Sequence, residues 1–282
     1  MKRDIQNYVK KCKSCQINKT LGPRHRAPME ITTTARKLFE RCEMDIVGPT
    51  PVTNKGNRYI LTFRDDLTKF VVAEPIPMQD AEIVAREFVR NIVLKFGISE
   101  VVLTDQGSNF LSQLFQNSCK FLRIRRIHTT AFHPESNGGI ERGHRVLVEY
   151  LRHYVTEDQR DWDDWITYAT HVYNVTTHRA TAYTQFELLF GYRARVLTSL
   201  QEQPTPRYNY DDYVYVSELK GRMQAAHAIA RGGLIESKIR SKIDYDRKIV
   251  QIAVKVGDRV LLFDESVRRG RSKKLVWQKR ER

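Results

Sequence analysis

The sequence predicts an α/β fold built on a mixed sheet, and three observations support this class. Residues 39–77 contain three strand-like stretches joined by turn signals, which is typical of an antiparallel meander. Residues 81–130 then alternate helix and strand patterns, and the chain beyond residue 138 becomes helical. With 41% hydrophobic and 10% aromatic residues, the 282-residue chain has enough apolar side chains for a globular core.

The expected elements follow one another in a simple order. Strands are expected at FERCEMDIVGP (39–49), NRYILTFRDD (57–66), KFVVAEPIP (69–77), VVLTDQG (101–107) and RIRRIHTT (123–130). Helices are expected near the start of the chain, at 81–97, at 109–122, after Gly138-Gly139, at 162–174 and at 217–249. Gly97 is the expected C-cap of the second helix, and Gly232-Gly233 is a candidate break in the last.

Charge is concentrated at the two ends of the chain. The net charge is +15, with 18 Lys/Arg and 8 Asp/Glu in residues 217–282 and 8 and 2 in residues 1–30. The region between them is almost neutral. Basic ends favour a polyanion partner, with nucleic acid the first candidate, although such ends can also be simple solvated tails.

Composition excludes several other classes of protein. No stretch approaches the roughly 18 uninterrupted apolar residues of a membrane span. The start of the sequence, MKRDIQNYVKKCKSC, lacks the apolar segment of a signal peptide. Four cysteines in this length do not predict a disulfide scaffold, so we expect a reducing compartment.

Three acids occur at strand or helix termini in the neutral middle of the chain. Asp45 lies in the first strand, Asp105 ends the fourth, and Glu141 begins the helix after Gly138-Gly139. Each has an ordinary interpretation: Asp45 as a solvent-facing residue, Asp105 as a turn cap and Glu141 as a complement to the helix dipole. Asp65, Asp66 and Glu135 show how common such acids are, since RDDLT predicts a hairpin and Glu135 precedes the helix.

The three acids can also converge, because sites in open sheets collect at strand ends and adjacent loops. Clustered carboxylates raise one another's pKa unless a cation holds them, and oxygen ligands favour a hard divalent metal. Two such metals can activate an attacking oxygen and stabilise a leaving oxygen at a phosphodiester.

Four stretches of the sequence are specific: MDIVGP, LTDQGSNF, FHPESNGGIER and FELLFGYRAR. They resemble the integrase core of retroviruses and gypsy-type long-terminal-repeat retrotransposons. That resemblance implies a ribonuclease-H-like fold, with a mixed five-stranded sheet flanked by helices. It places the family's Asp, Asp-x35-Glu triad on Asp45, Asp105 and Glu141 as ligands of Mg²⁺ or Mn²⁺. It also implies DNA contacts by Asn109 and Asn137. Arg142 and Arg145 follow Glu141 on the same helix, where they can contact DNA phosphates or simply form a solvated helix face.

The resemblance extends to both ends of the chain. It implies a remnant of a zinc-binding module at 1–30, the integrase core at 38–200, a linker and basic helix at 201–250, and the start of a small C-terminal β-barrel at 251–282. Cys12 and Cys15 match the cysteine half of a zinc site, with His25 and Cys42 the nearest substitutes for its histidines. No histidine precedes Cys12, so we expect zinc to bind weakly or not at all unless a longer parent protein completes the module. Gly143-His144 replace a common Phe-Asn of the family.

The leading functional prediction is a DNA integrase that processes the 3′ ends of element DNA and joins them to target DNA. The resemblance implies a homo-oligomer, a dimer or tetramer, that acts in the nucleus after a cytoplasmic particle stage. Two alternatives remain open at this point: a host-adopted or degraded derivative that binds nucleic acid without catalysis, and an RNA–DNA hybrid nuclease of the same fold.

Overall fold

The computed structural model describes residues 1–12, 14, 28–29, 31, 33–128, 138–196, 212–247, 261–263 and 279–281. For 138–143, 212–216, 261–263 and 279–281 it describes the backbone alone. The chain divides into two compact units, one formed by Ile31–Arg240 and the other by Met1–Glu30 together with Ser241–Arg282.

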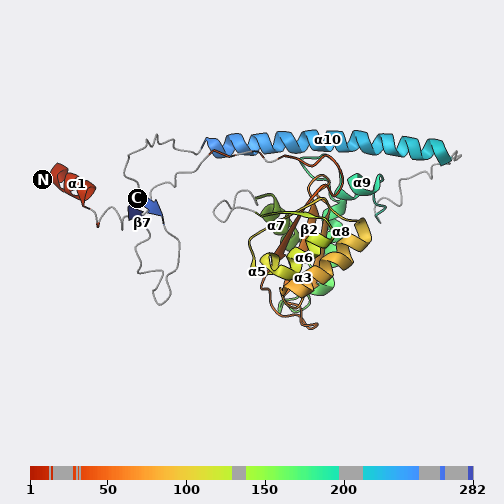
Figure 1. The fold of residues 1–282 in the computed structure, drawn as a ribbon, viewed down its shortest axis with the longest axis horizontal. Coiled ribbons are helices and arrows are strands. Elements are labelled where there is room, and N and C mark those ends of the chain that lie inside the picture. Colours follow the sequence, from red (N-terminus) through yellow and green to blue (C-terminus); the bar gives the residue numbers. More distant parts are fainter. Residues whose placement is uncertain are drawn as a thin grey trace. The chain divides into compact units, whose positions relative to one another are not determined.

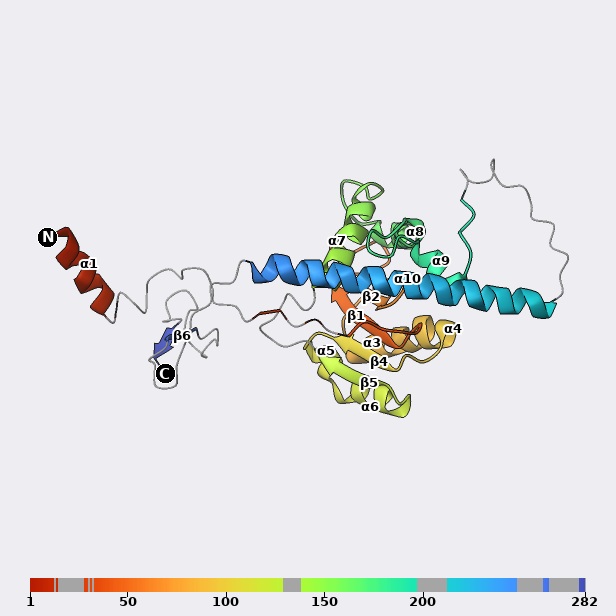
Figure 2. The same ribbon diagram turned by 90° about the horizontal axis from the view of Figure 1, so that it is seen from above.

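The larger unit is built on a five-stranded mixed sheet, as the sequence predicts (Figure 1). Its strands are β1 Arg41–Val47, β2 Tyr59–Asp65, β3 Val71–Ile76, β4 Val101–Thr104 and β5 Arg125–His128. The first three pair antiparallel as a meander, whereas β4 runs parallel to β1, and β5 runs parallel to β4. The spatial order is therefore β3-β2-β1-β4-β5, with β1 in the centre (Figure 2).

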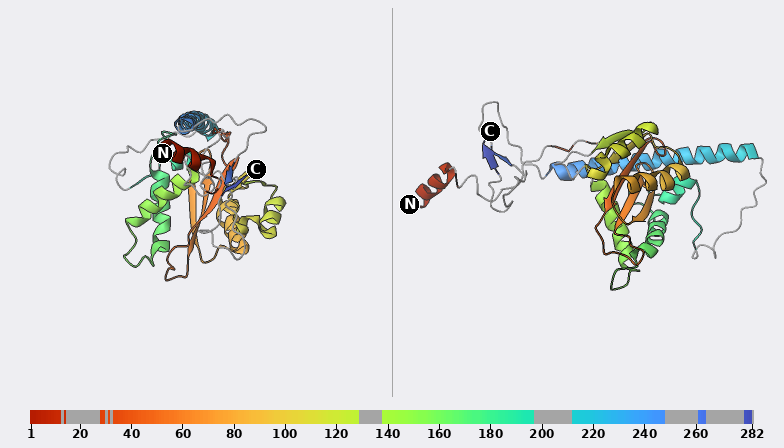
Figure 3. Two further views of the ribbon diagram at one scale, coloured as in Figure 1. Left: turned by 90° about the vertical axis from the view of Figure 1, so that its left-hand side faces the viewer. Right: turned by 60° about the horizontal axis from the view of Figure 1, so that its bottom comes forward.

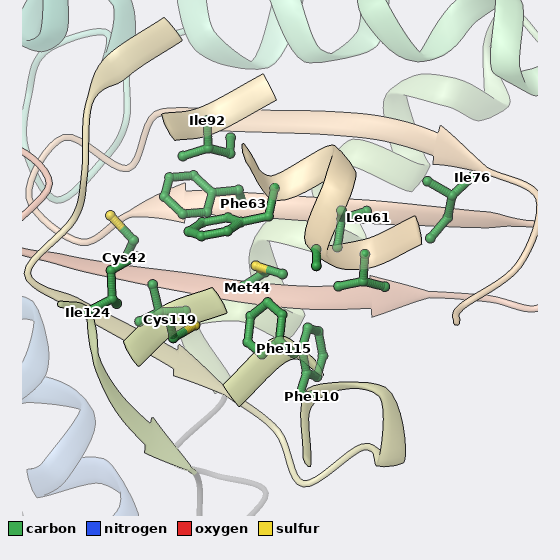
Figure 4. Close-up of a cluster of buried hydrophobic side chains, with 14 residues drawn as sticks. Cys42, Met44, Leu61, Phe63, Ile76, Ile92, Phe110, Phe115, Cys119 and Ile124 are labelled. Atoms are coloured by element: carbon green, nitrogen blue, oxygen red, sulfur yellow. The ribbon is translucent and has the colours of Figure 1, made fainter. Parts of the chain in front are cut away.

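Helices cover both faces of the sheet (Figure 3). One face packs against α3 Ala81–Phe88, α5 Ser108–Leu111 and α6 Gln113–Phe121, and the other against α7 Gly138–Arg152 and α8 Trp162–Val175. On the first face, Met44 of β1 lies among buried aromatic rings that include Phe110 and Phe115 (Figure 4). On the second face, Ile60 of β2 packs with Leu147 and Ile166. Alternate residues of each central strand therefore enter different cores.

Two of the predicted helices are interrupted. The helix expected at 81–97 continues from α3 through a π-helical segment, η1 (Val89–Val93), into α4 (Leu94–Phe96), and ends at Gly97 with φ 93° as expected. The helix expected at 109–122 is split into α5 and α6. Ser112 is the reason, because its extended backbone ends α5 while its hydroxyl accepts the Phe115 N–H as the N-cap of α6.

Gly232 and Gly233 do not break the last helix, so that expectation was wrong. Helix α10 runs without interruption from Asp212 to Asp246. A Cβ atom on Gly233 would lie 1.9 Å from the Ala180 carbonyl oxygen, which lies in the loop before α9 (Gln185–Phe190). Glycine at 233 is therefore explained by close helix packing rather than by a helix end.

The part of α10 in the larger unit is tied to that unit by side-chain contacts. Ala230 and Leu234 are buried, and His227 Nε2 lies 2.7 Å from the Leu188 carbonyl oxygen. Lys238 Nζ donates a hydrogen bond of 3.0 Å to Thr34 Oγ1. Helix α10 is thus an integral layer of the core over its first part rather than a free tail.

The smaller unit contains α1 (Lys2–Lys11), the end of α10, and a short ladder of β6 (Leu261–Phe263) with β7 (Lys279–Glu281). The helix predicted at the start of the chain is thus present. The zinc module and the small barrel remain predictions, because most of their residues, Cys15 and His25 among them, lie outside the described ones.

Candidate active site

Asp45 lies in β1, and Asp105 directly follows β4, the strand that runs parallel to β1. In the β1–β4 pairing, Glu43 is opposite Leu103. Asp45 and Asp105 each lie two residues beyond this last pair. Both acids are therefore found toward the carboxyl ends of neighbouring parallel strands, at the same edge of the sheet.

The Asp45 side chain points away from the aromatic core. Met44 faces that core, and side chains alternate along a strand, so Asp45 lies on the face covered by α7. Its side chain is 24% exposed, and its Oδ1 accepts the Ile46 N–H at 2.8 Å. Asp45 is therefore an acid held at a partly open position, rather than a fully solvated strand residue.

Asp105 begins a tight turn. Its Oδ1 accepts the Gly107 N–H at 2.9 Å, which fits the turn-cap interpretation of this residue. A Cβ atom on Gly107 would lie 3.0 Å from that oxygen and 2.6 Å from the Asn109 Oδ1, so a larger residue here would displace these two side chains. The same hydrogen bond also fixes the direction of the carboxylate, so capping and ligand binding are compatible roles.

The backbone of α7 brings Glu141 toward this end of the sheet, while its side chain lies outside the described part. Leu147 and Leu151 are buried against the sheet, which sets the rotation of the helix. His144, in the next turn of α7 after Glu141, contacts Asp45 of β1.

His144 is a contact residue that sequence reasoning treated only as a departure from the family pattern. Its Nε2 lies 2.7 Å from Thr62 Oγ1, and its Nδ1 lies 3.5 Å from Asp45 Oδ2. Burial, assisted by the Arg64 guanidinium, lowers the pKa of His144 to about 4, so the ring is neutral near pH 7. A histidine in the apolar stripe of an amphipathic helix was the available signal.

Asp65 and Asp66 have a structural role. Both are buried, in the turn between β2 and β3 that RDDLT predicts. Asp65 accepts hydrogen bonds from the Phe39 N–H and from the N–H and hydroxyl of Thr68. Asp66 pairs with Arg41 at 2.5 Å and Lys69 at 2.8 Å. These two acids therefore stabilise the β2–β3 turn and its contact with the start of β1.

The predicted DNA contacts are only partly described. Asn109 lies in α5, one short turn after Asp105, and Arg145 is exposed on α7 beside His144. Asn137 and the Arg142 side chain lie outside the described residues.

The zinc ligands are no better represented. Cys42 is fully buried in the aromatic core, and burial raises the pKa of its thiol, so it is not available to an N-terminal zinc site. Among the side chains that the structure describes, which exclude that of Glu141, no group of three or more His, Cys, Asp or Glu could hold a metal ion.

No helix within the described ranges is long and apolar enough to cross a membrane.

Comparison with known proteins identifies relatives of this chain. A family described as "Integrase core domain" matches residues 35–134. The retrovirus-related Pol polyprotein from transposon 412 of Drosophila melanogaster is 38% identical over 267 residues, which cover 94% of this chain and 21% of that polyprotein. The transposon Tf2-3 polyprotein of Schizosaccharomyces pombe is 25% identical over 193 residues, covering 68% of this chain and 14% of that polyprotein. The chain therefore spans only a minor part of the length of these relatives.

Solved structures agree on the fold. A chain in the cryo-EM structure of the simian T-cell lymphotropic virus intasome, in complex with PP2A regulatory subunit B56 gamma, superposes with a TM-score of 0.51. It is 19% identical, and the match covers 75% of this chain and 73% of that one. This likeness, with the observed strand order, confirms the ribonuclease-H-like sheet. The chain therefore carries an integrase core domain and is homologous to the Pol polyproteins of retrotransposons.

Proposed function

We propose that this chain is the integrase of a gypsy-type retrotransposon and inserts element DNA into target DNA. The observation that carries the proposal is that Asp45 in β1 and Asp105 directly after β4 lie at the same edge of the sheet, where His144 of α7, the helix that contains Glu141, contacts Asp45.

The donor set fits a hard divalent cation. Asp45 and Asp105 offer carboxylate oxygens from adjacent strands, and Glu141 would complete the set from α7. Mg²⁺ or Mn²⁺ held there would activate an attacking oxygen and stabilise the leaving oxygen at a phosphodiester. The family resemblance supports this assignment, since these three residues occupy the positions of its triad.

The proposed reaction has two steps. Water first cleaves a phosphodiester near the 3′ end of the element DNA, which leaves a 3′-hydroxyl. That hydroxyl oxygen then forms a bond to a phosphorus of the target strand, while the bond to the target's own 3′-oxygen breaks. The reaction needs no outside energy source, because one phosphodiester replaces another.

The chain's charge supports DNA as the partner. The basic ends supply attraction to phosphates that does not depend on sequence. Arg145, Lys220 and Arg222 are exposed on α7 and α10, where they can contact phosphates. A homo-oligomer and a nuclear site of action are parts of the same proposal.

A strand-transfer assay on the full chain, with a labelled duplex of element-end sequence and Mn²⁺ or Mg²⁺, tests the proposal. Asp45→Asn, Asp105→Asn and Glu141→Gln are each expected to abolish cleavage and joining. Glu149→Gln is the matched control, because Glu149 is exposed about two turns further along α7 and should leave activity unchanged.

Two outcomes would contradict parts of the proposal. A variant of the three that keeps near wild-type cleavage shows that its residue is not a ligand. A wild-type chain that binds the duplex with high affinity yet never cuts it supports the non-catalytic nucleic-acid binder instead.

A further inference from the structure

Asp105 lies just beyond the part of β4 that the sheet holds. The pairing of β4 with β1 extends to Leu103, and its pairing with β5 ends at Thr104 opposite His128. The backbone of Asp105 is therefore past the hydrogen-bonded ladder. Side-chain hydrogen bonds beyond the ladder can therefore contribute to its position relative to Asp45.

A hydroxyl group supplies the missing support. Thr104, which is 1% exposed, donates a hydrogen bond of 3.0 Å from Oγ1 to the Asp105 carbonyl oxygen. The same Oγ1 lies 3.1 Å from His128 Nδ1. The hydroxyl hydrogen is used on the carbonyl, so the histidine must be the donor in the second contact.

Arg126 fixes the tautomer of His128. Its Nη2 lies 2.7 Å from His128 Nε2, and a guanidinium can only donate. His128 Nε2 is therefore the acceptor, which leaves the proton on Nδ1 for Thr104. The guanidinium is in turn held 5.8 Å from the centre of the Phe115 ring. The chain of donors runs in one direction, from Arg126 through His128 and Thr104 to Asp105.

Asp45 has a parallel arrangement on the opposite face of the sheet. Thr62 Oγ1 donates to the Asp45 carbonyl oxygen at 3.1 Å and lies 2.7 Å from His144 Nε2. Thr62 lies on the same strand face as Ile60, and Thr104 lies on the same strand face as Val102. Ile60 and Val102 belong to the hydrophobic cores on opposite faces of the sheet. Each acid is thus held through its own carbonyl by a threonine–histidine pair, one from each side of the sheet.

We propose that His128, acting through Thr104, is a positioning residue for Asp105. It holds the end of β4 so that the Asp105 carboxylate stays level with that of Asp45 and the two can share a divalent cation. The inference rests on the proposed function, because it concerns the same metal-binding acids, but it assigns the role to residues outside the triad.

Direct Mn²⁺ binding to the chelator-washed full chain, followed by electron paramagnetic resonance, tests this role without relying on activity. His128→Ala and Thr104→Val should each weaken Mn²⁺ binding about tenfold, as is typical when the outer support of a metal ligand is lost. The Mn²⁺ concentration for half-maximal cleavage should rise by the same factor. The double variant should be no weaker than either single one, since both remove the same relay.

Conservative variants separate positioning from general damage. His128→Asn keeps an N–H at the place of Nδ1, and Thr104→Ser keeps the hydroxyl, so both should restore Mn²⁺ affinity to within about twofold of wild type. Exposed His153→Ala and Thr167→Val are matched controls that should change nothing. If His128→Ala fails to fold by circular dichroism, the comparison of His128→Asn and Thr104→Ser with Thr104→Val carries the test.

Failure of the relay and failure of the metal site give different results. If Asp45→Asn loses Mn²⁺ while His128→Ala and Thr104→Val bind it as wild type does, the relay is wrong and the metal site stands. If the asparagine and serine variants are as weak as the alanine and valine variants, the hydrogen bonds are not the cause and the relay is again wrong. If the wild-type chain binds no Mn²⁺, the metal site is wrong and the relay falls with it.

Discussion

The core domain carries two pairs of acids at opposite ends of its central strands, and they have opposite environments. Asp65 and Asp66 lie beside the start of β1, and the Asp66 side chain is 2% exposed between Arg41 and Lys69. Asp45 and Asp105 lie toward the ends of β1 and β4, where Asp45 is 24% exposed and receives contacts from a neutral histidine and a backbone N–H.

The difference shows how a fold distinguishes structural acids from candidate ligands. Burial alone would raise the pKa of Asp66, but Lys69 and Arg41 hold it well below its ordinary value. A carboxylate whose cations are built into the protein is already compensated. A carboxylate at a strand end that is partly exposed, such as that of Asp45, can be reached by a cation from solution. Sequence spacing alone does not separate these two cases, because both pairs lie at strand ends.

The largest effect on stability is expected at the buried pair. Asp66→Ala leaves Arg41 and Lys69 without their common partner in a buried position, and should lower the free energy of unfolding by about 3–5 kcal/mol. Urea denaturation at pH 7 measures it. The loss should shrink as the pH falls below about 4, because the unfolded chain then protonates Asp66 while the folded chain keeps it charged.

A change of less than 1 kcal/mol at pH 7 would contradict this assignment. So would a loss that grows on acidification, since the lowered pKa requires the contribution to be present above the unfolded pKa and to disappear below it. Asp66→Asn is a useful second variant, because it keeps the shape and removes only the charge.

A smaller effect on stability is expected where α10 packs near Asp65 and Asp66. Lys238 of α10 lies close enough to Asp66 to contribute to its lowered pKa. Displacing α10 should therefore destabilise the Asp65–Asp66 region and leave Asp45 and Asp105 unaffected. Gly233→Ala places a Cβ against the Ala180 carbonyl and should cost about 1–3 kcal/mol. Urea unfolding and hydrogen exchange of α10 amides measure the change.

Gly232→Ala is the matched control for that variant. No atom outside the adjacent residues and the helix's own backbone lies within 4 Å of a Cβ at this position, so the substitution should stabilise the helix by up to about 1 kcal/mol. Equal effects of the two variants would show that the close approach to Ala180 does not govern the packing of α10. Mn²⁺ binding should be the same in both.

The smallest change in stability is expected at the candidate ligands. Without metal, Asp45→Asn and Asp105→Asn should unfold at the same or a slightly higher urea concentration than wild type, because each removes one of two neighbouring negative charges. Saturating Mn²⁺ should then stabilise the wild type by about 2.7 kcal/mol at a hundredfold excess over its Kd, and neither variant. A metal-free loss as large as that of Asp66→Ala would place Asp45 or Asp105 in the structural class.

The two histidines of the site show the limit of sequence reasoning. The strands and the antiparallel meander of the first three follow from local signals: alternating hydrophobicity, turn residues, and the glycine that ends the helix at Gly97. The five-stranded architecture and the acid triad follow from the family resemblance. His128 carries no such signal, and the only signal for His144 is its place in the apolar stripe of α7. Their roles depend on Thr104 and Thr62, which reach them through strand pairing and helix packing.

The sequence by itself determined the strands and the two basic ends, because each is encoded in residue type and spacing within a short window, and its family resemblance supplied the triad candidates. Only the tertiary structure decided that Asp66 is neutralised by Arg41, that Ser112 divides a helix, and that Gly233 admits a neighbouring carbonyl. These outcomes depend on which groups from distant parts of the chain come into contact. Burial and the charges of neighbouring groups set the pKa of a carboxylate, and both depend on the tertiary structure rather than on the residue type.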